Sequence, residues 1–100
     1  MPAYMPNASL WIATYDIADP ARLRAVASLC EDYGRRLQQS VFLCACPARQ
    51  IKRLRDAVLE RMEGTKDHFV LLPLCEHCRN HLRQLGLEKS LPGSEGPIVV

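Results

Sequence analysis

The chain has 100 residues, which is enough for one domain but not for two independent cores. Hydrophobic residues make up 48% and charged residues 24%, as in an ordinary globular protein, and the formal net charge of +2 does not by itself indicate a partner. No run approaches the ~18 apolar residues of a membrane span, and residues 1–10 lack the features of a signal peptide. The five cysteines, an odd number, argue against a disulfide framework, so we expect a protein of the reducing cytoplasm.

The first third of the chain predicts one strand and one helix. Residues 1–9 contain two prolines and no periodicity, so we expect a flexible leader. Residues 10–17 (LWIATYDI) are rich in β-branched and aromatic residues and apolar on both faces, which predicts a central strand. Asp19 is a good N-cap and Pro20 a good first helical residue. Apolar residues then recur at helical spacing as far as Tyr33, and Gly34 predicts a left-handed helix end.

The middle of the chain predicts a strand, a helix and a second buried strand. Residues 36–46 alternate from Gln39 onward, which predicts a strand that a bend near Gln38-Gln39 would divide in two. Pro47 opens a helix that Gly64 closes. Its apolar stripe comprises Ile51, Leu54, Val58 and Met62. Residues 68–74 (HFVLLPL) predict the next buried strand.

The remaining segment predicts a tight turn or short helix within residues 75–86, followed by a brief strand around Leu82–Leu85. The complete order predicts an α+β fold, a ferredoxin-like βαββαβ sandwich with a short additional C-terminal strand. We assign the domain to residues 10–86 and a tail to residues 87–100. The tail ends in Ile98-Val99-Val100, which predicts either a frayed end or strand addition to a partner.

Asp16 is the first candidate site residue, because it stands at the end of an otherwise apolar strand. One interpretation is a capping or turn residue that leads into Asp19-Pro20. The other is a catalytic ligand for Mg²⁺, which takes one or two carboxylates and keeps several waters. One aspartate is too little for a tight site, so this interpretation requires a dimer that brings two copies of Asp16 to one shared ion.

Basic and aromatic residues form the second group of candidates. Arginine and lysine cluster between positions 22 and 55, which favours a polyanionic partner over solvated helix faces. Phe42 and Tyr15 are candidates for stacking on bases, although core packing is the better interpretation of a lone aromatic residue in a strand.

The motif Cys75-x-x-Cys78 invites a third interpretation. With His81 it supplies three zinc ligands, whereas a closed zinc site needs four. Redox chemistry of the pair is a further alternative, and a tight turn built from small side chains is the interpretation that we favour.

Several motifs in register resemble the family of CRISPR-associated protein two, the small partner of the spacer integrase. They are TYDIADP with arginines at 22 and 24, EDYGRRLQQSVFLC and VLLPLCEHC, and the match spans residues 10–86. The resemblance implies a cytoplasmic prokaryotic protein, a ferredoxin-like homodimer, and an Asp16 that faces its symmetry mate across a cleft. It also implies that Arg36 and Phe42 flank the cleft, and that Arg22 and Arg24 are basic positions of the first helix.

The resemblance leaves two functions open. The first is a Mg²⁺-dependent endonuclease for single-stranded RNA or double-stranded DNA. The second, which we favour, is a scaffold that bridges integrase subunits and supports the protospacer duplex. The predicted nucleic-acid-binding residues serve both functions, and they are Arg22, Arg24, Arg35, Arg36 and Phe42. A zinc or redox module at Cys75 and Cys78 is the alternative from a different class.

Overall fold

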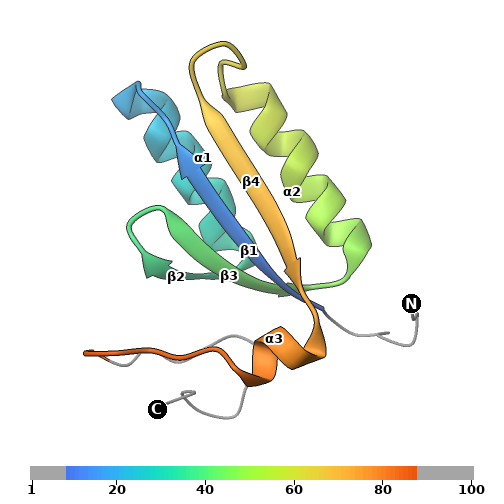
Figure 1. The fold of residues 1–100 in the computed structure, drawn as a ribbon. Helices are drawn as coiled ribbons and strands as arrows, with labels where there is room; N and C mark the ends of the chain where they lie inside the picture. The colour runs from blue at the N-terminus through green and yellow to red at the C-terminus, as the bar shows by residue number, and fades with distance from the viewer. Residues whose placement is uncertain (1–8, 88–100) are drawn as a thin grey trace.

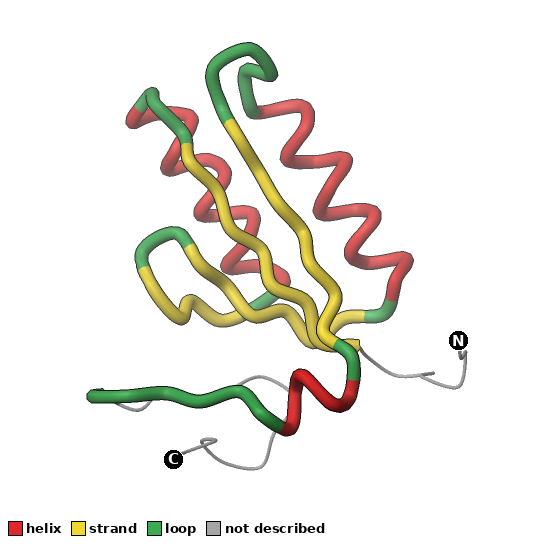
Figure 2. Tube along the Cα trace, viewed as in Figure 1, coloured by secondary structure: helices red, strands yellow, loops and turns green. Residues whose placement is uncertain are grey.

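The structure is a computed structural model that describes residues 9–87 (Figure 1). Its elements are β1 (Ser9–Asp16), α1 (Pro20–Tyr33), β2 (Arg35–Gln38), β3 (Val41–Cys46), α2 (Ala48–Arg61), β4 (His68–Leu74) and α3 (Glu76–Asn80). The strands form one sheet in the order β2-β3-β1-β4, and all neighbouring strands are antiparallel. α1 and α2 lie on one face of this sheet, and α3 follows the end of β4 (Figure 2). The predicted α+β class and the division of the second strand are confirmed.

The predicted leader up to residue 8 and the tail from residue 88, including Ile98-Val99-Val100, lie outside the described residues. Within residues 9–87, no helix has both the length and the apolar character that a membrane crossing requires.

α1 begins and ends where the sequence predicts, but its C-terminal end has a different physical basis. Oδ2 of Asp19 accepts the backbone N–H of Arg22 at 2.9 Å, and Pro20 is the first helical residue. Gly34 is extended (φ −161°, ψ −168°), so the predicted left-handed end is wrong. Its lack of a side chain matters for packing instead, because a Cβ here would lie 2.6 Å from Sγ of Cys44. The glycine allows the chain to pass close to β3.

α2 packs its predicted apolar stripe into the core. Pro47 is its N-cap residue, and Ile51, Leu54 and Val58 are buried. The helix ends at Arg61, earlier than the predicted end at Gly64.

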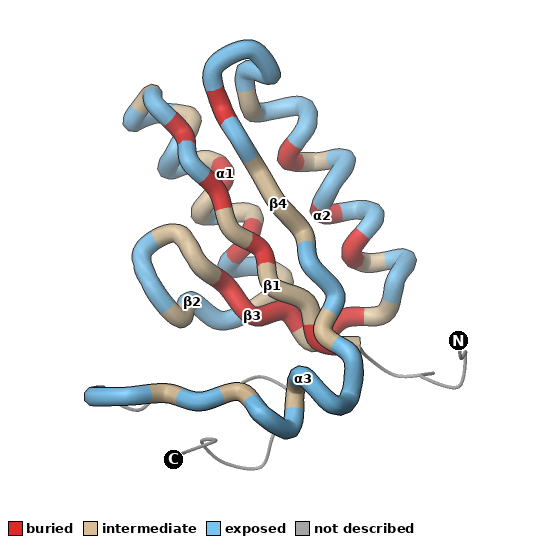
Figure 3. The backbone as a smooth tube through the Cα atoms, in the orientation of Figure 1, coloured by how far each residue is buried: buried red, intermediate tan, exposed pale blue. Residues whose placement is uncertain are grey.

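The main core lies between the sheet and the two long helices (Figure 3). The alternation of side chains along each strand decides which residues enter it. In β3, Phe42, Cys44 and Cys46 are buried in this core. In β1, Ala13 and Tyr15 are buried there, with Ile17 just beyond the strand.

The opposite face of the sheet, which we call the open face, carries only a small apolar cluster. Leu10 and Leu43 are buried at its centre. The partly buried residues packed around them are Ile12, Leu37, Ala45, Leu74 and Leu82. Leu72 of β4, paired with Ile12, is 51% exposed. Much of this apolar face is therefore in contact with water in the single chain.

The segment after β4 confirms one prediction and corrects another. The short helix predicted within residues 75–86 is α3. The strand predicted around Leu82–Leu85 does not form, and these residues have no regular secondary structure. Leu82 packs against the open-face cluster, whereas Leu85 is 87% exposed. An alternating apolar pattern stabilises a strand only where a neighbouring surface covers the apolar side chains, and this chain provides no such cover for Leu85.

Candidate nucleic-acid interface

Asp16 lies on the open face, at the last position of β1. It shares this face with Leu10 and Ile12, because alternate residues of a strand point to the same side. It is exposed, and the residue opposite it on β4 is His68. Asp19, and not Asp16, caps α1, so the capping interpretation of Asp16 is wrong. The carboxylate is thus held at the rim of an apolar surface.

One chain alone does not supply a complete metal site at Asp16. Among residues 9–87, no group of three or more histidine, cysteine or carboxylate side chains is placed to hold an ion. Mg²⁺ accepts one or two carboxylates when water and substrate phosphate fill its remaining positions. Asp16 of a single protomer therefore offers one carboxylate to such an ion, and a site with two Asp16 carboxylates would require a second protomer.

Phe42 lies inside the main core rather than at a surface. It is 0% exposed, and its ring is stacked with Tyr15, with ring centroids 6.2 Å apart. The ring of Phe69 continues this aromatic group on the other side of Tyr15, at 6.4 Å. A buried ring offers no face to a base, so the position of Phe42 fits core packing and not base stacking.

Arg36 connects this aromatic group with the solvent. It is paired with Phe42 between β2 and β3, and its guanidinium carbon lies 5.1 Å from the centre of the Phe42 ring. An Nη2 atom of Arg36 also lies 3.9 Å from Oε2 of Glu31. The side chain is about half exposed, so this ion pair is weak and the guanidinium remains accessible to a phosphate.

Arg24 and Arg36 come together at one pocket of about 410 Å³, which we call the basic pocket. Its lining residues are Tyr15, Leu23, Arg24, Ala27, Arg36, Gln39 and Ser40. The hydroxyl of Tyr15 donates to the backbone oxygen of Gln39 at 3.3 Å, and burial raises the pKa of Tyr15, so the phenol stays neutral. Two guanidinium groups beside a neutral phenol and an amide suit an anionic ligand with hydrogen-bonding oxygens.

The basic pocket and Asp16 belong to different faces but to the same end of the sheet. Asp16 is on the open face. Phe42, and Arg36 opposite it on β2, belong to the face that the helices cover. The backbone N–H of Tyr15 donates to the backbone oxygen of Ser40 at 3.3 Å, which holds the turn between β2 and β3 beside the end of β1. Arg35 is exposed, and because it is paired with Leu43 it lies on the open face, as Asp16 does.

Arg22 is held by a buried carboxylate that the sequence interpretation missed. Nε of Arg22 lies 2.7 Å from Oδ2 of Asp67, and Nη2 lies 3.2 Å from Oδ1. The side chain of Asp67 is 0% exposed and also accepts the backbone N–H groups of Glu63 at 2.8 Å and Ala18 at 3.3 Å. The Arg22 hydrogen bond and these backbone donors hold the pKa of Asp67 far below its usual range.

This ion pair, which we call the Arg22–Asp67 clamp, joins the first turn of α1 to the loop before β4. The guanidinium edge that binds Asp67 is not available to a phosphate, so the geometry favours a structural role for Arg22. The only local signal in the sequence was an aspartate immediately before residues 68–74, which were predicted as a buried strand. In the single chain β4 is an edge strand whose residues are all half-buried or exposed, so the predicted burial is wrong.

The cysteine motif lies at the opposite end of the sheet. Cys75 is the N-cap of α3, and its Sγ accepts the backbone N–H of Cys78 at 3.5 Å. Nδ1 of His81 lies 2.8 Å from the backbone oxygen of His77, and the two imidazole rings are stacked with centroids 4.3 Å apart. These contacts turn His81 toward His77, and no three-ligand group forms among the described residues, so the predicted zinc set is not assembled.

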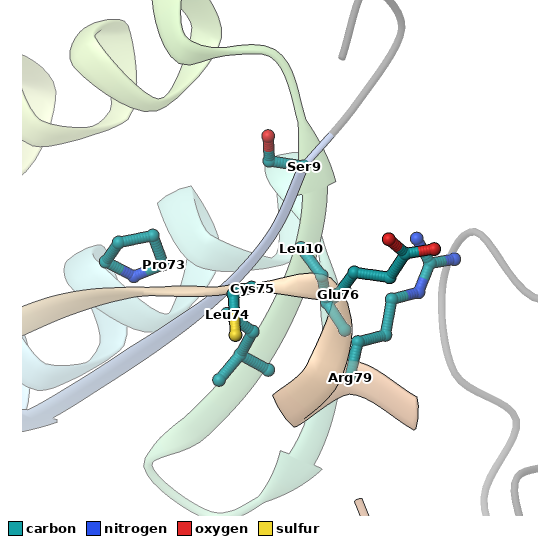
Figure 4. A pocket seen from close by; sticks show the side chains of 7 residues that line it. All are labelled: Ser9, Leu10, Pro73, Leu74, Cys75, Glu76 and Arg79. Carbon is teal, nitrogen blue, oxygen red and sulfur yellow. The ribbon is translucent and has the colours of Figure 1, made fainter. Parts of the chain in front are cut away.

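Cys75 also lines a pocket of about 580 Å³ with Ser9, Leu10, Pro73, Leu74, Glu76 and Arg79 (Figure 4). The pocket lies where the start of β1 meets the end of β4.

The fold and the candidate site define a small α+β protein with a four-stranded antiparallel sheet, an open face that ends in a carboxylate, and a nearby arginine-lined pocket. A family model described as CRISPR associated protein Cas2 matches residues 9–82. The chain therefore belongs to the Cas2 family.

Individual relatives agree with this assignment. The chain is 33% identical to the CRISPR-associated endoribonuclease Cas2 of Nitratidesulfovibrio vulgaris, over 97% of this chain and 99% of that protein. It is 28% identical to the CRISPR-associated endonuclease Cas2 of Halalkalibacterium halodurans, over 90% and 98% of the two chains. The crystal structure of Streptococcus pyogenes Cas2 at pH 6.5 superposes with a TM-score of 0.69 at 30% identity, and the match covers 77% of this chain and 99% of that one.

Proposed function

We propose that this protein acts in CRISPR spacer acquisition as a ferredoxin-like homodimer that binds nucleic acid and scaffolds the integrase subunit. The observation that carries the proposal is the open face, an incompletely covered apolar surface bordered by Asp16. Membership of the Cas2 family supports the CRISPR role.

The open face is the dimer surface in this proposal. A chain of 100 residues buries only about 60–70% of the surface that its unfolded form exposes, so covering a further apolar surface adds stability. Ile12, Val70 and Leu72 lie on this face and are half-buried or exposed in the single chain. A second copy with the same surface covers them through a self-complementary, two-fold interface. That symmetry also repeats Asp16 and the basic pocket on both protomers.

The basic pocket supplies the contact to nucleic acid. Arg24 and Arg36 have exposed guanidinium groups that neutralise phosphates without reading bases, which is what a scaffold for protospacers of any sequence requires. A double-stranded DNA protospacer is the substrate that we favour, and single-stranded RNA is the alternative.

A Mg²⁺-dependent endonuclease is the second candidate function, favoured by the position of Asp16. An aspartate exposed at the rim of the open face is accessible to substrate, and a partner protomer supplies the second carboxylate. The relatives' names, endoribonuclease and endonuclease, agree with phosphodiester hydrolysis. When bound between two Asp16 side chains, Mg²⁺ would lower the pKa of a water nucleophile.

The dimer surface can be tested with two leucine-to-arginine variants. Leu72 is 51% exposed on the open face, and Leu59 is 61% exposed on α2, on the other side of the sheet. By sedimentation equilibrium we expect twice the chain mass of 11.3 kDa for the wild type and for Leu59→Arg, but the single mass for Leu72→Arg. Copurification with the integrase subunit should be lost in the same variant. A monomeric wild type, or a dimeric Leu72→Arg protein, would contradict the proposed interface.

A further inference from the structure

The five cysteines fall into two groups with opposite environments. Cys30, Cys44 and Cys46 are buried in the main core, and burial raises the pKa of Cys30 and of Cys44 to about 12. Cys75 and Cys78 are exposed. Reaction at sulfur requires a thiolate and access to solvent, so any thiol chemistry of this chain is confined to the exposed pair.

The backbone holds the two exposed thiols close together. Cys75 caps α3, and its Sγ accepts the N–H of Cys78, the residue three positions further along the turn, at 3.5 Å. The oxygen of Cys75 accepts the N–H of Arg79 at 2.9 Å, which fixes the same turn from its other side. The two thiol side chains also interact with each other directly. Cβ atoms three residues apart on a helical turn are about 5–6 Å from one another, so they have to approach by only about 1 Å to reach the ~3.5–4.5 Å of a disulfide.

We propose that Cys75 and Cys78 form a reversible intramolecular disulfide by exchange with a low-molecular-weight disulfide such as oxidised glutathione. The Cys75 thiolate attacks one sulfur of the glutathione disulfide, which forms a mixed disulfide and releases one glutathione. Cys78 then attacks Sγ of Cys75, which closes the internal bond and releases the second glutathione. The two thiols lose two electrons and two protons, and glutathione disulfide gains both to become two glutathione molecules.

The surroundings distinguish the roles of the two sulfur atoms. The hydrogen bond from the Cys78 N–H lowers the pKa of Cys75, whereas the neighbouring Cys75 raises the pKa of Cys78. Cys75 is therefore the attacking thiolate and Cys78 the resolving thiol. This assignment agrees with the accessibility of Cys75, which lines the pocket between β1 and α3 (Figure 4).

The disulfide would restrict the conformation of the segment that follows β4. α3 directs the backbone from the end of β4 to Leu82, which packs against the cluster on the open face. In the reduced protein, a weak sulfur hydrogen bond closes the first turn of α3. A covalent bond in its place restricts the unfolding of that turn, so oxidation holds residues 81–87 on their path beside the open face.

Intact-protein mass spectrometry after alkylation in denaturant tests the bond. We expect five alkyl groups on the reduced chain and three after incubation with oxidised glutathione in the presence of a chelator, with the missing two mapped to the peptide that contains Cys75 and Cys78. The variant Cys78→Ser should instead retain one glutathione on Cys75, and dithiothreitol should reverse both products. Cys30, Cys44 and Cys46 are internal controls that remain alkylatable.

Five alkyl groups after oxidation, a bond that involves a buried cysteine, or a bond between two chains would each overturn the proposal. Hydrogen exchange tests its structural consequence. Oxidation should slow exchange of the Arg79 amide by up to roughly tenfold, because the bond restrains the opened turn. Unchanged exchange at Arg79 in fully oxidised protein would overturn the effect on α3.

Discussion

Replacing Gly34 with alanine should destabilise the protein through a steric collision between the residue that follows α1 and β3. The new Cβ would lie 2.6 Å from Sγ of Cys44 and would collide with the backbone oxygen of Leu43. Ordinary contacts of a Cβ begin near 3.4 Å, so the sulfur of Cys44 has to move by roughly 0.8 Å and the nearer backbone oxygen of Leu43 by more. β3 is an inner strand of the sheet, with Phe42 and Leu43 buried on its two faces, and it has little room to move.

Overpacking of this kind costs about 1–3 kcal/mol. For a domain of this size, each kcal/mol lowers the Tm by about 4–8 °C. The backbone at Gly34 is extended and accessible to any residue, so the collision alone accounts for the loss.

Gly64→Ala is the matched control, because a Cβ at this position meets no atom within 4 Å. Unfolding in urea, followed by the fluorescence of the single tryptophan at equal protein concentrations, measures both variants. We expect Gly64→Ala to lie within about 1 kcal/mol of the wild type, since this exchange also reduces the entropy of the unfolded chain. Equal free energies of unfolding for the two variants would refute the proposed collision.

Three further predictions concern the candidate site. Arg24→Ala and Arg36→Ala should each weaken binding to DNA of any sequence, and each should flatten the salt dependence of log affinity by about one unit per lost phosphate contact. The control variant Arg61→Ala should bind DNA as the wild type does. If binding titrations show a loss of affinity for certain sequences only, these arginines read bases instead. Asp16→Ala should abolish Mg²⁺-dependent cleavage and leave the dimer intact, and undiminished cleavage by the purified variant would exclude this aspartate from catalysis. Because the pKa of Asp67 is depressed in the folded state, its stabilisation is complete above the unfolded value of 3.8 and is lost as the pH falls through the folded value. Asp67→Asn should therefore lower stability at neutral pH and flatten its decline in acid, as equilibrium unfolding across pH measures.

Local sequence signals predicted the elements well where the cause of the structure is itself local. Asp19 and Pro20 mark the start of α1 because capping and a fixed φ act within one turn. Gly34 marks the end of α1, but the conformation predicted for it was wrong. Position 34 requires glycine because the chain passes close to β3 there, and a pattern of neighbouring residues does not reveal such a contact.

The candidate site was predicted less completely because its geometry depends on pairings between distant residues. Arg22 was interpreted as a phosphate contact, yet its partner Asp67 stands 45 positions along the chain. The faces of the sheet separate Phe42 from Asp16, although both were assigned to one cleft. Arg24 and Arg36, by contrast, do line one pocket. Residue type indicated an affinity for polyanions, but only the fold decides which arginines remain available.

The order of strands has a consequence for how the protein is synthesised. β1 emerges first from the ribosome, yet it pairs on one side with β3 and on the other with β4, where Leu10 meets Leu74. The backbone N–H and C=O groups on one edge of β1 therefore stay unpaired until β4 has been translated. Nonlocal pairing of this kind slows folding and leaves strand edges open to other chains. Among residues 9–87, β4 is the strand that completes the pairing of β1, so nascent chains that stop before β4 should be the species most prone to aggregate.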